Sequence, residues 1–540
     1  MIFLFRKHFF EVSLLSVALI FSAWLMWHTF SYQDGYLFIA AKAWSDFASH
    51  IPLIRSFSLG DNWPPEYPLF PGEPIRYHFL FYLLVGLLEK VGLPLDWALN
   101  FPSGLSFFLL LAAIYLLAKH LFQSKGVALL SVLFFLFNGS LSFLEFFKNH
   151  PLGIHTLSDM LQVSDFPSFG PYDGKIVSAF WNLNIYTNQR HLALPLALLL
   201  LLVLWILKTE KKASMLQIAL GGIFLGVLPF AHSSVFIMAI GIFGMLFILL
   251  KKQKMTIFGI LIAGVLLSMP RVIFLKNSAS FIPKLELGYL TPHPVTLSSF
   301  LNYWFLNLGL AFLLIPFGFF LAPKRAKKVF VAFLPLFLVG NLVQFSIEMA
   351  GNHKFFTVFV IVANMFVAYS VFKIWHQKIF GKILAIILFF FLTLSGIIDF
   401  FVVKNDHFYQ IADYPKNPDV AWIMQNTLKN TIFLNSNYLY NPASLAGHKI
   451  FLGWPYFPWS LGYDTTRRDK ELRDMLNTNS TDEACKLLMQ NRISYVEIQR
   501  HDVNPDFTIN YDLFNKSFKQ TYNNPESGLS LFTIQPTCNN

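Results

Sequence analysis

Two side chains near the N-terminus have the spacing that proton chemistry requires. Asp46 and His50 lie four residues apart in the segment WSDFASHIPLIRSFS, so a helix would place them one turn apart on one face. An imidazole at that distance can orient a carboxylate or hold its charge. A second acid, Asp34, follows the first apolar run of the chain directly. Taken alone, either acid could instead be a solvated loop charge.

An amphipathic helix between residues 39 and 57 is the element expected to position the acid and the histidine. Its apolar side chains recur at helical spacing and are Ile39, Ala43, Phe47, Ile51 and Ile54. Its polar face holds Lys42, Asp46, Ser49 and His50. This pattern predicts an interfacial helix that lies on the membrane surface, within a long first loop of residues 31–75.

The composition of the chain is that of an integral membrane protein. Of its 540 residues, 55% are hydrophobic and 13% are charged, about half the charged fraction of a soluble domain. A soluble globular protein and a disordered one are therefore excluded. Twelve apolar segments have about the 17–22 residues that cross ~30 Å of hydrocarbon as a helix. These segments are 12–30, 76–96, 103–121, 127–144, 191–207, 215–231, 233–250, 256–274, 301–322, 329–348, 355–373 and 381–402.

The positive charges between these segments predict the topology. They gather in the clusters Lys208/Lys211/Lys212, Lys251/Lys252/Lys254, Lys324/Arg325/Lys327/Lys328 and, more weakly, Lys373/Lys378/Lys382. The positive-inside rule places all of them in the cytoplasm and residues 403–540 outside it. Arg6 and Lys7 place the N-terminus inside as well, so the number of spans is odd. We predict a polytopic α-helical protein with 11 or 13 transmembrane helices, the unassigned crossing lying between residues 76 and 190.

Residues 403–540 predict a soluble, extracytoplasmic α/β domain behind a transmembrane domain of residues 1–402. Short β-branched or aromatic runs alternate there with helical patterns. The runs are 431–434, 449–452, 494–498 and 529–534, and the helical patterns are 417–428, 466–476 and 482–491. Despite the net charge of +11, this part has no basic face interleaved with aromatics, which argues against nucleic-acid binding. The two cysteines, Cys485 and Cys538, could form one disulfide, and no metal-ligand spacing accompanies them.

One predicted span carries a row of polar side chains. The row has the spacing i, i+3, i+7 and i+11 and consists of Asn341, Gln344, Glu348 and Asn352. On a helix continuing from segment 329–348 the row would form one face and line a wet cavity. Hydrogen bonding between helices explains such a row equally well. His353 or Lys354 could be the partner of the Glu348 carboxylate.

The layout resembles that of the C-type membrane glycosyltransferases: an acid in the first extracytoplasmic loop after one span, many further spans, and a C-terminal extracytoplasmic α/β domain. The segments that resemble a prokaryotic branch of this superfamily are WSDFASHIPLIRSFS, PGEPIRYHFLFYLLVGLLEKVGLPLDWALNFPS, NQRHLALPLALLL, GVLPFAHSSVF, SLAGHKIFLGWPYFPWSLGYDTTRRDKELRDML and LLMQNRISYVEIQR. The resemblance implies an enzyme of the prokaryotic plasma membrane. It would transfer a sugar from a polyprenyl-phosphate donor to an extracytoplasmic acceptor (protein, lipid or glycan), with inversion at the anomeric carbon.

The resemblance also implies roles for the acids. A general base must take the proton from the acceptor hydroxyl as it attacks. Asp46 matches the position of the loop acid in this superfamily, His50 would support it, and Asp34 is the second choice. A divalent cation that helps hold the donor phosphate could be bound by neighbouring acids, but these lack a recognisable ligand spacing. They are Asp61, Glu66 and Glu73.

A donor phosphate needs fixed positive charge at the outer boundary of the membrane. The basic residues expected there are Arg76, Arg190, Arg271 and Lys354. Arg190 is favoured, because further hydrogen-bonding groups flank it in Asn188, Gln189 and His191. Ordinary anchoring of helix ends in the interface explains such residues as well. His232, which resembles a loop residue of the superfamily, is expected to be structural.

Two other functions remain open. A transporter or flippase for a lipid-linked saccharide would share the polar and basic residues, although the absence of a visible internal repeat weakens it. A non-catalytic scaffold would bind glycans through its tail. The aromatic residues that could stack on sugar rings, or simply pack, are Trp454, Tyr456, Phe457 and Trp459.

Overall fold

The computed structural model describes residues 2–170, 174–209, 213–276 and 282–538, with side chains from residue 9 onward. Arg6, Lys7, Lys211 and Lys212, which entered the predicted topology, lie outside the described side chains. The chain divides into two compact units. We call them the helical unit (residues 2–29, 100–273 and 282–407) and the α/β unit (residues 30–99, 274–276 and 408–538). The C-terminal part of the α/β unit begins at residue 408, near the expected boundary at residue 403. The unit also contains the whole of the first long loop.

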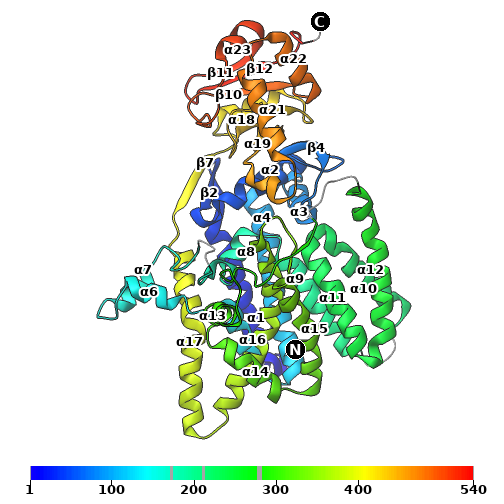
Figure 1. Ribbon diagram of the computed structural model, residues 1–540, viewed down its shortest axis with the longest axis vertical. Coiled ribbons are helices and arrows are strands. Elements are labelled where there is room, and N and C mark those ends of the chain that lie inside the picture. The colour runs from blue at the N-terminus through cyan, green and yellow to red at the C-terminus, as the bar shows by residue number, and fades with distance from the viewer. Residues whose placement is uncertain (1, 171–173, 210–212, 277–281, 539–540) are drawn as a thin grey trace. The chain divides into compact units, whose positions relative to one another are not determined.

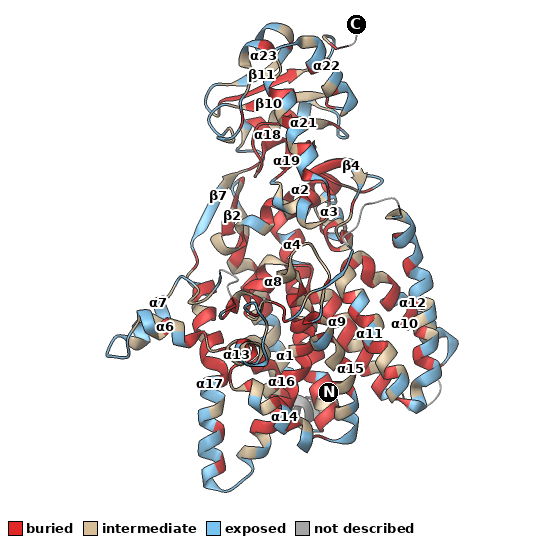
Figure 2. Cartoon of the chain, in the orientation of Figure 1, coloured by how far each residue is buried: buried red, intermediate tan, exposed pale blue. Residues whose placement is uncertain are grey.

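The helical unit consists of helices and a two-stranded ribbon, β5 (Lys284–Leu285) with β6 (Val343–Gln344). Most of its helices are labelled in Figure 1. They are α1 (Ile2–Thr29), α4 (Leu95–Phe122, from residue 100 onward), α5 (Lys125–Leu136), α6 (Phe143–Asn149), α7 (Thr156–Gln162), α8 (Asn184–Asn188), α9 (Ala193–Lys208), α10 (Met215–Ala231), α11 (Ser233–Leu249), α12 (Lys254–Phe274), α13 (Leu297–Leu308), α14 (Ala311–Leu321), α15 (Lys324–Gly340), α16 (His353–Trp375) and α17 (Ile379–Lys404). Helix α16 is enclosed along almost its whole length, as Figure 2 shows.

Five described helices are long and apolar enough to cross a membrane. They are Phe9–Thr29, Leu95–Phe122, Lys251–Phe274, Met349–Trp375 and Ile379–Lys404. The pair α13 and α14 would add a sixth span if it is one broken crossing, and α5, α9, α10 and α11 are apolar but shorter. The chain is therefore polytopic and helical, as predicted, whereas the count of 11 or 13 spans stays a prediction.

Four expected spans are not continuous helices, namely 76–96, 127–144, 301–322 and 329–348, the last because α15 ends at Gly340. Segment 76–96 contains only α3 (Leu80–Lys90), because Gly92 and Pro94 interrupt the helix before α4 begins. Eleven residues rise about 17 Å, too little to cross ~30 Å of hydrocarbon. Segment 127–144 likewise holds the 12-residue α5, which ends before Asn138 and Gly139.

The expected span 301–322 is also broken. Helices α13 and α14 meet at an angle of 88°. Gly309 lies at the bend with φ +55°, a conformation that glycine adopts without strain. A Cβ atom there would collide with the carbonyl oxygen of Gly139, so the close approach of these two backbones requires glycine.

The α/β unit is built from three sheets and short helices. Its elements are β1 (Phe30–Gln33), β2 (Tyr36–Ala40), α2 (Trp44–Ser58), β3 (Glu66–Tyr67), β4 (Phe70–Pro74), α3, β7 (Phe408–Ala412), α18 (Pro418–Asn426), β8 (Ile432–Asn435), α19 (Pro442–Leu445), β9 (Lys449–Ile450), α20 (Tyr456–Ser460), α21 (Thr465–Asn477), α22 (Thr481–Gln490), β10 (Tyr495–Gln499), α23 (Tyr511–Ser517), β11 (Lys519–Asn524) and β12 (Leu529–Thr533). The main sheet has the order β11-β12-β10-β8-β9, with β8 parallel to both β10 and β9. Strand β7 pairs antiparallel with β2, which joins the first loop to the tail in one sheet, β1-β2-β7.

The predicted alternation of strands and helices in the tail is confirmed. The four apolar runs became β8, β9, β10 and β12, and the three helical patterns became α18, α21 and α22. Strands β7 and β11 were not predicted. Their exposed polar or aromatic residues lack the apolar alternation by which a half-buried strand is recognised.

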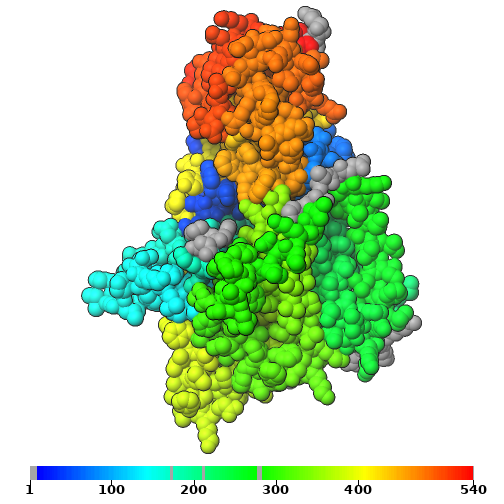
Figure 3. All heavy atoms as spheres, in the orientation of Figure 1, coloured from blue at the N-terminus to red at the C-terminus, as the bar shows by residue number. Residues whose placement is uncertain are grey.

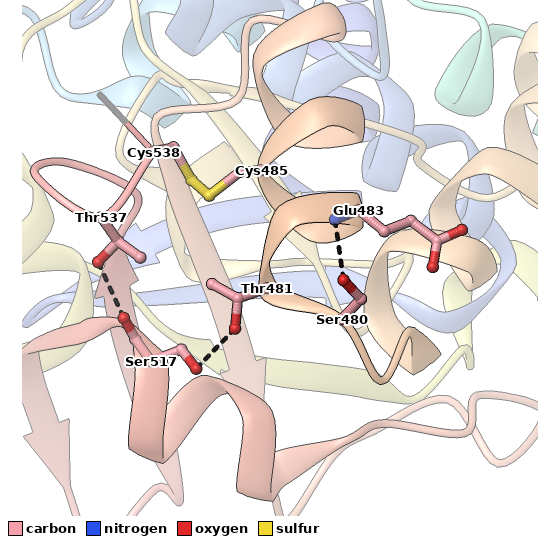
Figure 4. Close-up of a disulfide and its surroundings, with 7 residues drawn as sticks. All are labelled: Ser480, Thr481, Glu483, Cys485, Ser517, Thr537 and Cys538. Atoms are coloured by element: carbon pink, nitrogen blue, oxygen red, sulfur yellow. Dashed lines mark hydrogen bonds between the residues drawn. A yellow bond between two sulfur atoms is a disulfide. The ribbon is translucent and has the colours of Figure 1, made fainter. Parts of the chain in front are cut away.

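The disulfide that the sequence left open is formed between Cys485 on α22 and Cys538 near the end of the described chain (Figure 4). It closes a loop of 53 residues, which on the chain-entropy account stabilises the fold by about 4 kcal/mol. Hydrogen bonds around it reinforce the link: Thr537 Oγ1 donates to Ser517 O at 2.9 Å, and the Ser517 and Thr481 hydroxyls lie 2.9 Å apart.

Glu497 is buried in the middle of strand β10. Burial raises the pKa of its carboxyl to about 8 and outweighs the favourable contacts with Asn441 and the Ala443 backbone. The folded protein therefore holds a proton that an unfolded chain releases at about pH 4.5. The free energy of unfolding accordingly falls as the pH rises from about 4.5 to about 8, and it is constant above that range.

We expect Glu497→Gln to stabilise the α/β unit at pH 8.5, by up to about 5 kcal/mol, and to change it little at pH 4.5. Hydrogen exchange of the β10 amides in the full-length protein measures this when wild type and variant are compared at each pH. The exposed Glu526→Gln is the matched control and should match wild type at both pH values. Equal β10 protection in wild type and Glu497→Gln at pH 8.5 would contradict the shift.

Candidate functional site

Asp46 lies in the first turn of helix α2, which begins at Trp44 rather than at residue 39. The preceding residues form strand β2, in which Ile39 pairs with Tyr409 of β7. The expected helix was thus too long at its N-terminal end, because pairing with a strand from the tail overrides the local helical pattern. Asp46 is half-buried, and the helix dipole favours a negative charge at this end of the helix.

Helix α2 is more enclosed than the predicted amphipathic pattern implies, and its place on the membrane surface stays a prediction. An interfacial helix keeps one polar face in water, but every residue of α2 from His50 to Ser58 is buried. Helix α2 packs against α3 and α19. The packing is close: a Cβ on Gly86 of α3 would lie 2.8 Å from Ile54 O, and a Cβ on Gly60 would collide with Gly447 O.

Tyrosine side chains surround Asp46. Its charge acts on the hydroxyls of Tyr67, Tyr77, Tyr82 and Tyr440. Burial, and after it the charge of Asp46, raises the pKa of Tyr77 and that of Tyr440. These phenols therefore stay protonated at neutral pH, where each can donate and accept hydrogen bonds.

Two of these tyrosines hold the neighbourhood of Asp46 in place. The Tyr440 hydroxyl donates to Trp44 O at 2.6 Å, and its ring lies 4.2 Å from the Trp44 ring. Tyr82 packs against the buried imidazole of His50 in a tilted arrangement, with ring centroids 4.7 Å apart. Asp46 and His50 therefore lie one turn apart on α2, near aromatic hydroxyls, and their roles stay a prediction.

A buried ion network fixes the second half of α2. Arg55 Nε lies 2.9 Å from Glu89 Oε1 of α3, and Arg55 Nη2 lies 2.6 Å from Asp413 Oδ2 just after β7. Burial acts to lower the pKa of Arg55, but the two carboxylates outweigh it and raise the pKa. All three side chains are nearly excluded from solvent, so each needs its partners.

Asp34 has a structural explanation. It lies at the turn of the β1–β2 hairpin with φ +51°, followed by Gly35 with φ +79°. Asp and Gly are the residues that a tight hairpin turn with positive φ selects. The side chain is exposed.

The acids considered for a divalent cation do not form a ligand set in the described structure. Glu66 pairs with Lys449 at 2.8 Å, Glu73 pairs with Arg76, and Asp61 is exposed. Arg76 also donates to Gly462 O, and its guanidinium lies 4.1 Å from the centroid of the Tyr463 ring. The charge of Arg76 is therefore balanced within the α/β unit.

Arg190 follows α8 in the helical unit and is almost fully buried. Nε donates to Thr187 O at 2.7 Å, Nη1 to Asn100 Oδ1 at 3.0 Å and to the sulfur of Met26, and Nη2 to Met26 O and to Thr29 Oγ1 at 2.8 Å. These five bonds use all five N–H groups of the guanidinium. They tie α1, α4 and the end of α8 together, which gives Arg190 a structural role. Its expected contact with a phosphate stays a prediction.

The remaining candidates lie in the helical unit. Arg271 is buried near the end of α12, and Asn188 and Gln189 are half-buried. His191 stacks on His232 with ring centroids 5.4 Å apart, while His353 stacks on Phe180 at 4.6 Å. Lys354 interacts electrostatically with His232 and His353, so these three residues are neighbours.

The polar row predicted along one helical face is wrong. Helix α15 ends at Gly340, and residues 341–352 form a loop with the short strand β6. The side chains instead satisfy the backbone of this loop: Asn352 Nδ2 donates to Gly340 O and Val343 O, and Gln344 Nε2 donates to Ser346 O and Ile347 O. Asn341 accepts from Trp304 Nε1 at 3.1 Å. A helical spacing does not show that a helix is present.

The residues that sequence reasoning missed are Arg55, Glu89, Asp413 and the tyrosines around Asp46. Arg55 and Glu89 each stand within an apolar stretch, and an ionised residue in such a place needs a buried partner. That signal marks the residues but not the pairing. Asp413 is 358 residues away from Arg55, and no local pattern connects them.

Solved structures similar to the chain include three of the oligosaccharyltransferase from Archaeoglobus fulgidus. The form tethered to an acceptor peptide containing the NVT sequon has 12% identity and a TM-score of 0.49, over 92% of this chain and 69% of that one. The AglB complex with an inhibitory peptide and a dolichol-phosphate has 11% identity and a TM-score of 0.49, over 92% and 70%. The apo form has 11% identity and a TM-score of 0.48, over the same shares. No family model and no curated protein matches the chain. At these values, no residue role in this chain follows from the similarity.

We expect Arg190→Gln to destabilise the helical unit, because it leaves buried acceptors on α1, α4 and α8 unsatisfied. The loss should be at least about 3 kcal/mol, seen as a melting temperature lower by about 5–10 °C in detergent. Arg325→Gln, an exposed change of the same type, should melt like wild type. If Arg190→Gln melts normally but binds a polyprenyl-phosphate sugar less tightly, Arg190 is a phosphate ligand instead.

Proposed function

We propose that the chain is an integral membrane glycosyltransferase, inverting at the anomeric carbon, which uses a polyprenyl-phosphate sugar as donor and an extracytoplasmic hydroxyl as acceptor. The observation that carries this proposal is the half-buried Asp46 carboxylate among tyrosine hydroxyls, on a helix fixed by buried ion pairs. A carboxylate held in this way suits a general base better than a solvated loop charge does. The loop-acid resemblance of the sequence points in the same direction.

The proposed reaction is a single displacement. The acceptor oxygen attacks the anomeric carbon of the donor sugar while the Asp46 carboxylate takes the acceptor proton. The bond between the anomeric carbon and the phosphate oxygen breaks, and polyprenyl phosphate leaves with the electron pair. His50 is a positioning residue in this scheme, because its buried ring packs on Tyr82 one turn from Asp46.

The tyrosines suit a saccharide or another hydroxyl-bearing acceptor. Protonated phenols can both donate to and accept from hydroxyl groups, and their rings offer apolar faces to a sugar. The raised pKa of Tyr77 and that of Tyr440, caused by burial and by Asp46, favour this protonated form. For the donor phosphate, the proposal keeps the four basic residues expected from the sequence, Arg76, Arg190, Arg271 and Lys354. Two of them also have partners within their own unit: Arg76 pairs with Glu73, and Arg190 donates to groups on α1, α4 and α8.

The disulfide supports an extracytoplasmic α/β domain. Disulfides persist in oxidising compartments such as the cell exterior and are rare in the cytosol. The bond between Cys485 and Cys538 therefore agrees with the basic clusters, which place residues 403–540 outside the plasma membrane.

We expect Asp46→Asn to lower turnover by at least ~100-fold while donor binding and folding are kept. The assay is release of polyprenyl phosphate from a lipid-linked sugar by the purified, reconstituted protein. Asp34→Asn is the matched control, because asparagine also tolerates the positive φ of that turn, and it should cost little. His50→Ala should fall between the two.

Turnover by Asp46→Asn within a few-fold of wild type would remove Asp46 as the base. If wild type itself releases no polyprenyl phosphate but moves lipid-linked saccharides across vesicle membranes, the transporter alternative replaces the proposal.

A further inference from the structure

The hairpin of α6 and α7 stands out in the helical unit. The two helices have seven residues each, so each rises about 10 Å and neither can cross the hydrocarbon. Helix α7 has no buried residue. In Figure 3 the hairpin, coloured cyan, protrudes from the side of the helical unit near α17.

The hairpin is fastened to the C-terminal end of the span α17. Phe143 and Phe146 of α6 form a small buried cluster with Leu394 and Ile398 of α17. Just beyond α17, Asn405 Nδ2 donates to Leu161 O at 2.8 Å and to Val163 O at 3.0 Å. Both helices of the hairpin are therefore held beside the C-terminal end of α17.

The free edge of the hairpin is apolar and strongly exposed. Leu152 is 78% exposed and Ile154 is 93% exposed in the turn, and Leu157 and Leu161 of α7 are exposed beside them. Isolated exposed apolar residues are common, but four along one short edge form a patch that usually contacts lipid or protein.

The span beside the hairpin also exposes apolar side chains. Ile386 and Phe390 are exposed on α17, as expected for side chains that face hydrocarbon. Farther along α17, the half-exposed Phe391 contacts Phe143 of α6 with ring centroids 5.8 Å apart. The contact between α17 and α6 is therefore apolar.

The hairpin also has a polar side. Lys148 and Glu145 form an exposed ion pair on α6. A hollow between α6, α7 and the following residues is lined by polar groups, among them His150, Asp159 and Asp165. A short helical element with an apolar edge and a polar side fits the boundary between lipid headgroups and acyl chains.

We propose that α6 and α7 form an interfacial hairpin whose edge, Leu152, Ile154, Leu157 and Leu161, inserts into the headgroup–acyl boundary of the lipid bilayer. Because the basic cluster Lys373/Lys378/Lys382 lies at the start of α17, the hairpin lies in the outer leaflet. This inference depends on the chain spanning a membrane and not on the proposed enzymatic activity.

A fluorescent thiol probe tests the insertion directly. Both native cysteines are disulfide-bonded, so an introduced cysteine is the one free thiol among the described residues. Ile154→Cys is labelled with an environment-sensitive bimane probe, and the full-length protein is reconstituted into phosphatidylcholine vesicles. Quenching is compared between a lipid carrying a nitroxide near its headgroup (5-doxyl) and aqueous iodide.

We expect the probe at residue 154 to be quenched at least ~3-fold more by the doxyl lipid than by iodide, because an edge inserted at the headgroup–acyl boundary lies close to the nitroxide and away from water. Leu428→Cys is the matched control: it is 84% exposed on the α/β unit and should show the opposite preference. Ile386→Cys on α17 is the reference for lipid contact, and Lys148→Cys on the polar side should be reached by iodide.

Two results would overturn the inference. If iodide quenches the probe at residue 154 as well as that at residue 428, the edge lies in water. If neither quencher reaches it while Ile386→Cys responds to the doxyl lipid, the edge is covered by protein, a partner or a second copy of this chain. Measuring both quenchers on one folded, reconstituted sample distinguishes these results without any activity assay.

Discussion

The buried ion network of Arg55, Glu89 and Asp413 is the constraint on which the candidate site depends. Three ionised side chains are removed from water, and their desolvation is offset only while Arg55 stays within hydrogen-bonding distance of both acids. Helix α2, helix α3 and the strand β7 therefore cannot separate without leaving a charge buried and unpaired. The backbones of Gly60 and Gly447 also lie so close together that a larger side chain at Gly60 would collide with Gly447 O.

This constraint explains how a loop residue can have a defined geometry. Asp46 lies two turns before Arg55 on the same helix, so fixing the second half of α2 also fixes the carboxylate relative to the tyrosines around it. Tyr440 comes from the tail, and its hydroxyl donates to the backbone oxygen of Trp44, the first residue of α2. This bond fixes the N-terminal end of the helix, close to Asp46. The first loop and the tail thus form one unit, and the proposed base belongs to that unit.

Sequence reasoning succeeded where structure depends on local pattern. The polytopic helical character, the α/β tail and the helix that carries Asp46 and His50 all follow from composition or from spacing along a few residues. It failed where distant contacts decide: strand pairing with β7 shortened α2, and packing against α3 and α19 buried it. The glycines at the helix breaks, Gly92, Gly139 and Gly309, can be read from the sequence. A single glycine within a long apolar segment does not by itself predict that the helix ends there. The prediction of a polar helical face near residue 348 was wrong, because side chains of a loop have helical spacing there by coincidence.

Hydrogen exchange of residues 44–58 in Arg55→Met tests most directly whether the Arg55 network holds the helix that carries Asp46. Removing the cation leaves two buried acids, so the free energy of local opening of α2 should fall by about 3–5 kcal/mol. Arg467→Met, which removes an exposed arginine from an ion pair on α21, should leave the exchange of α2 unchanged. Protection of α2 in Arg55→Met within ~0.5 kcal/mol of wild type would contradict the account.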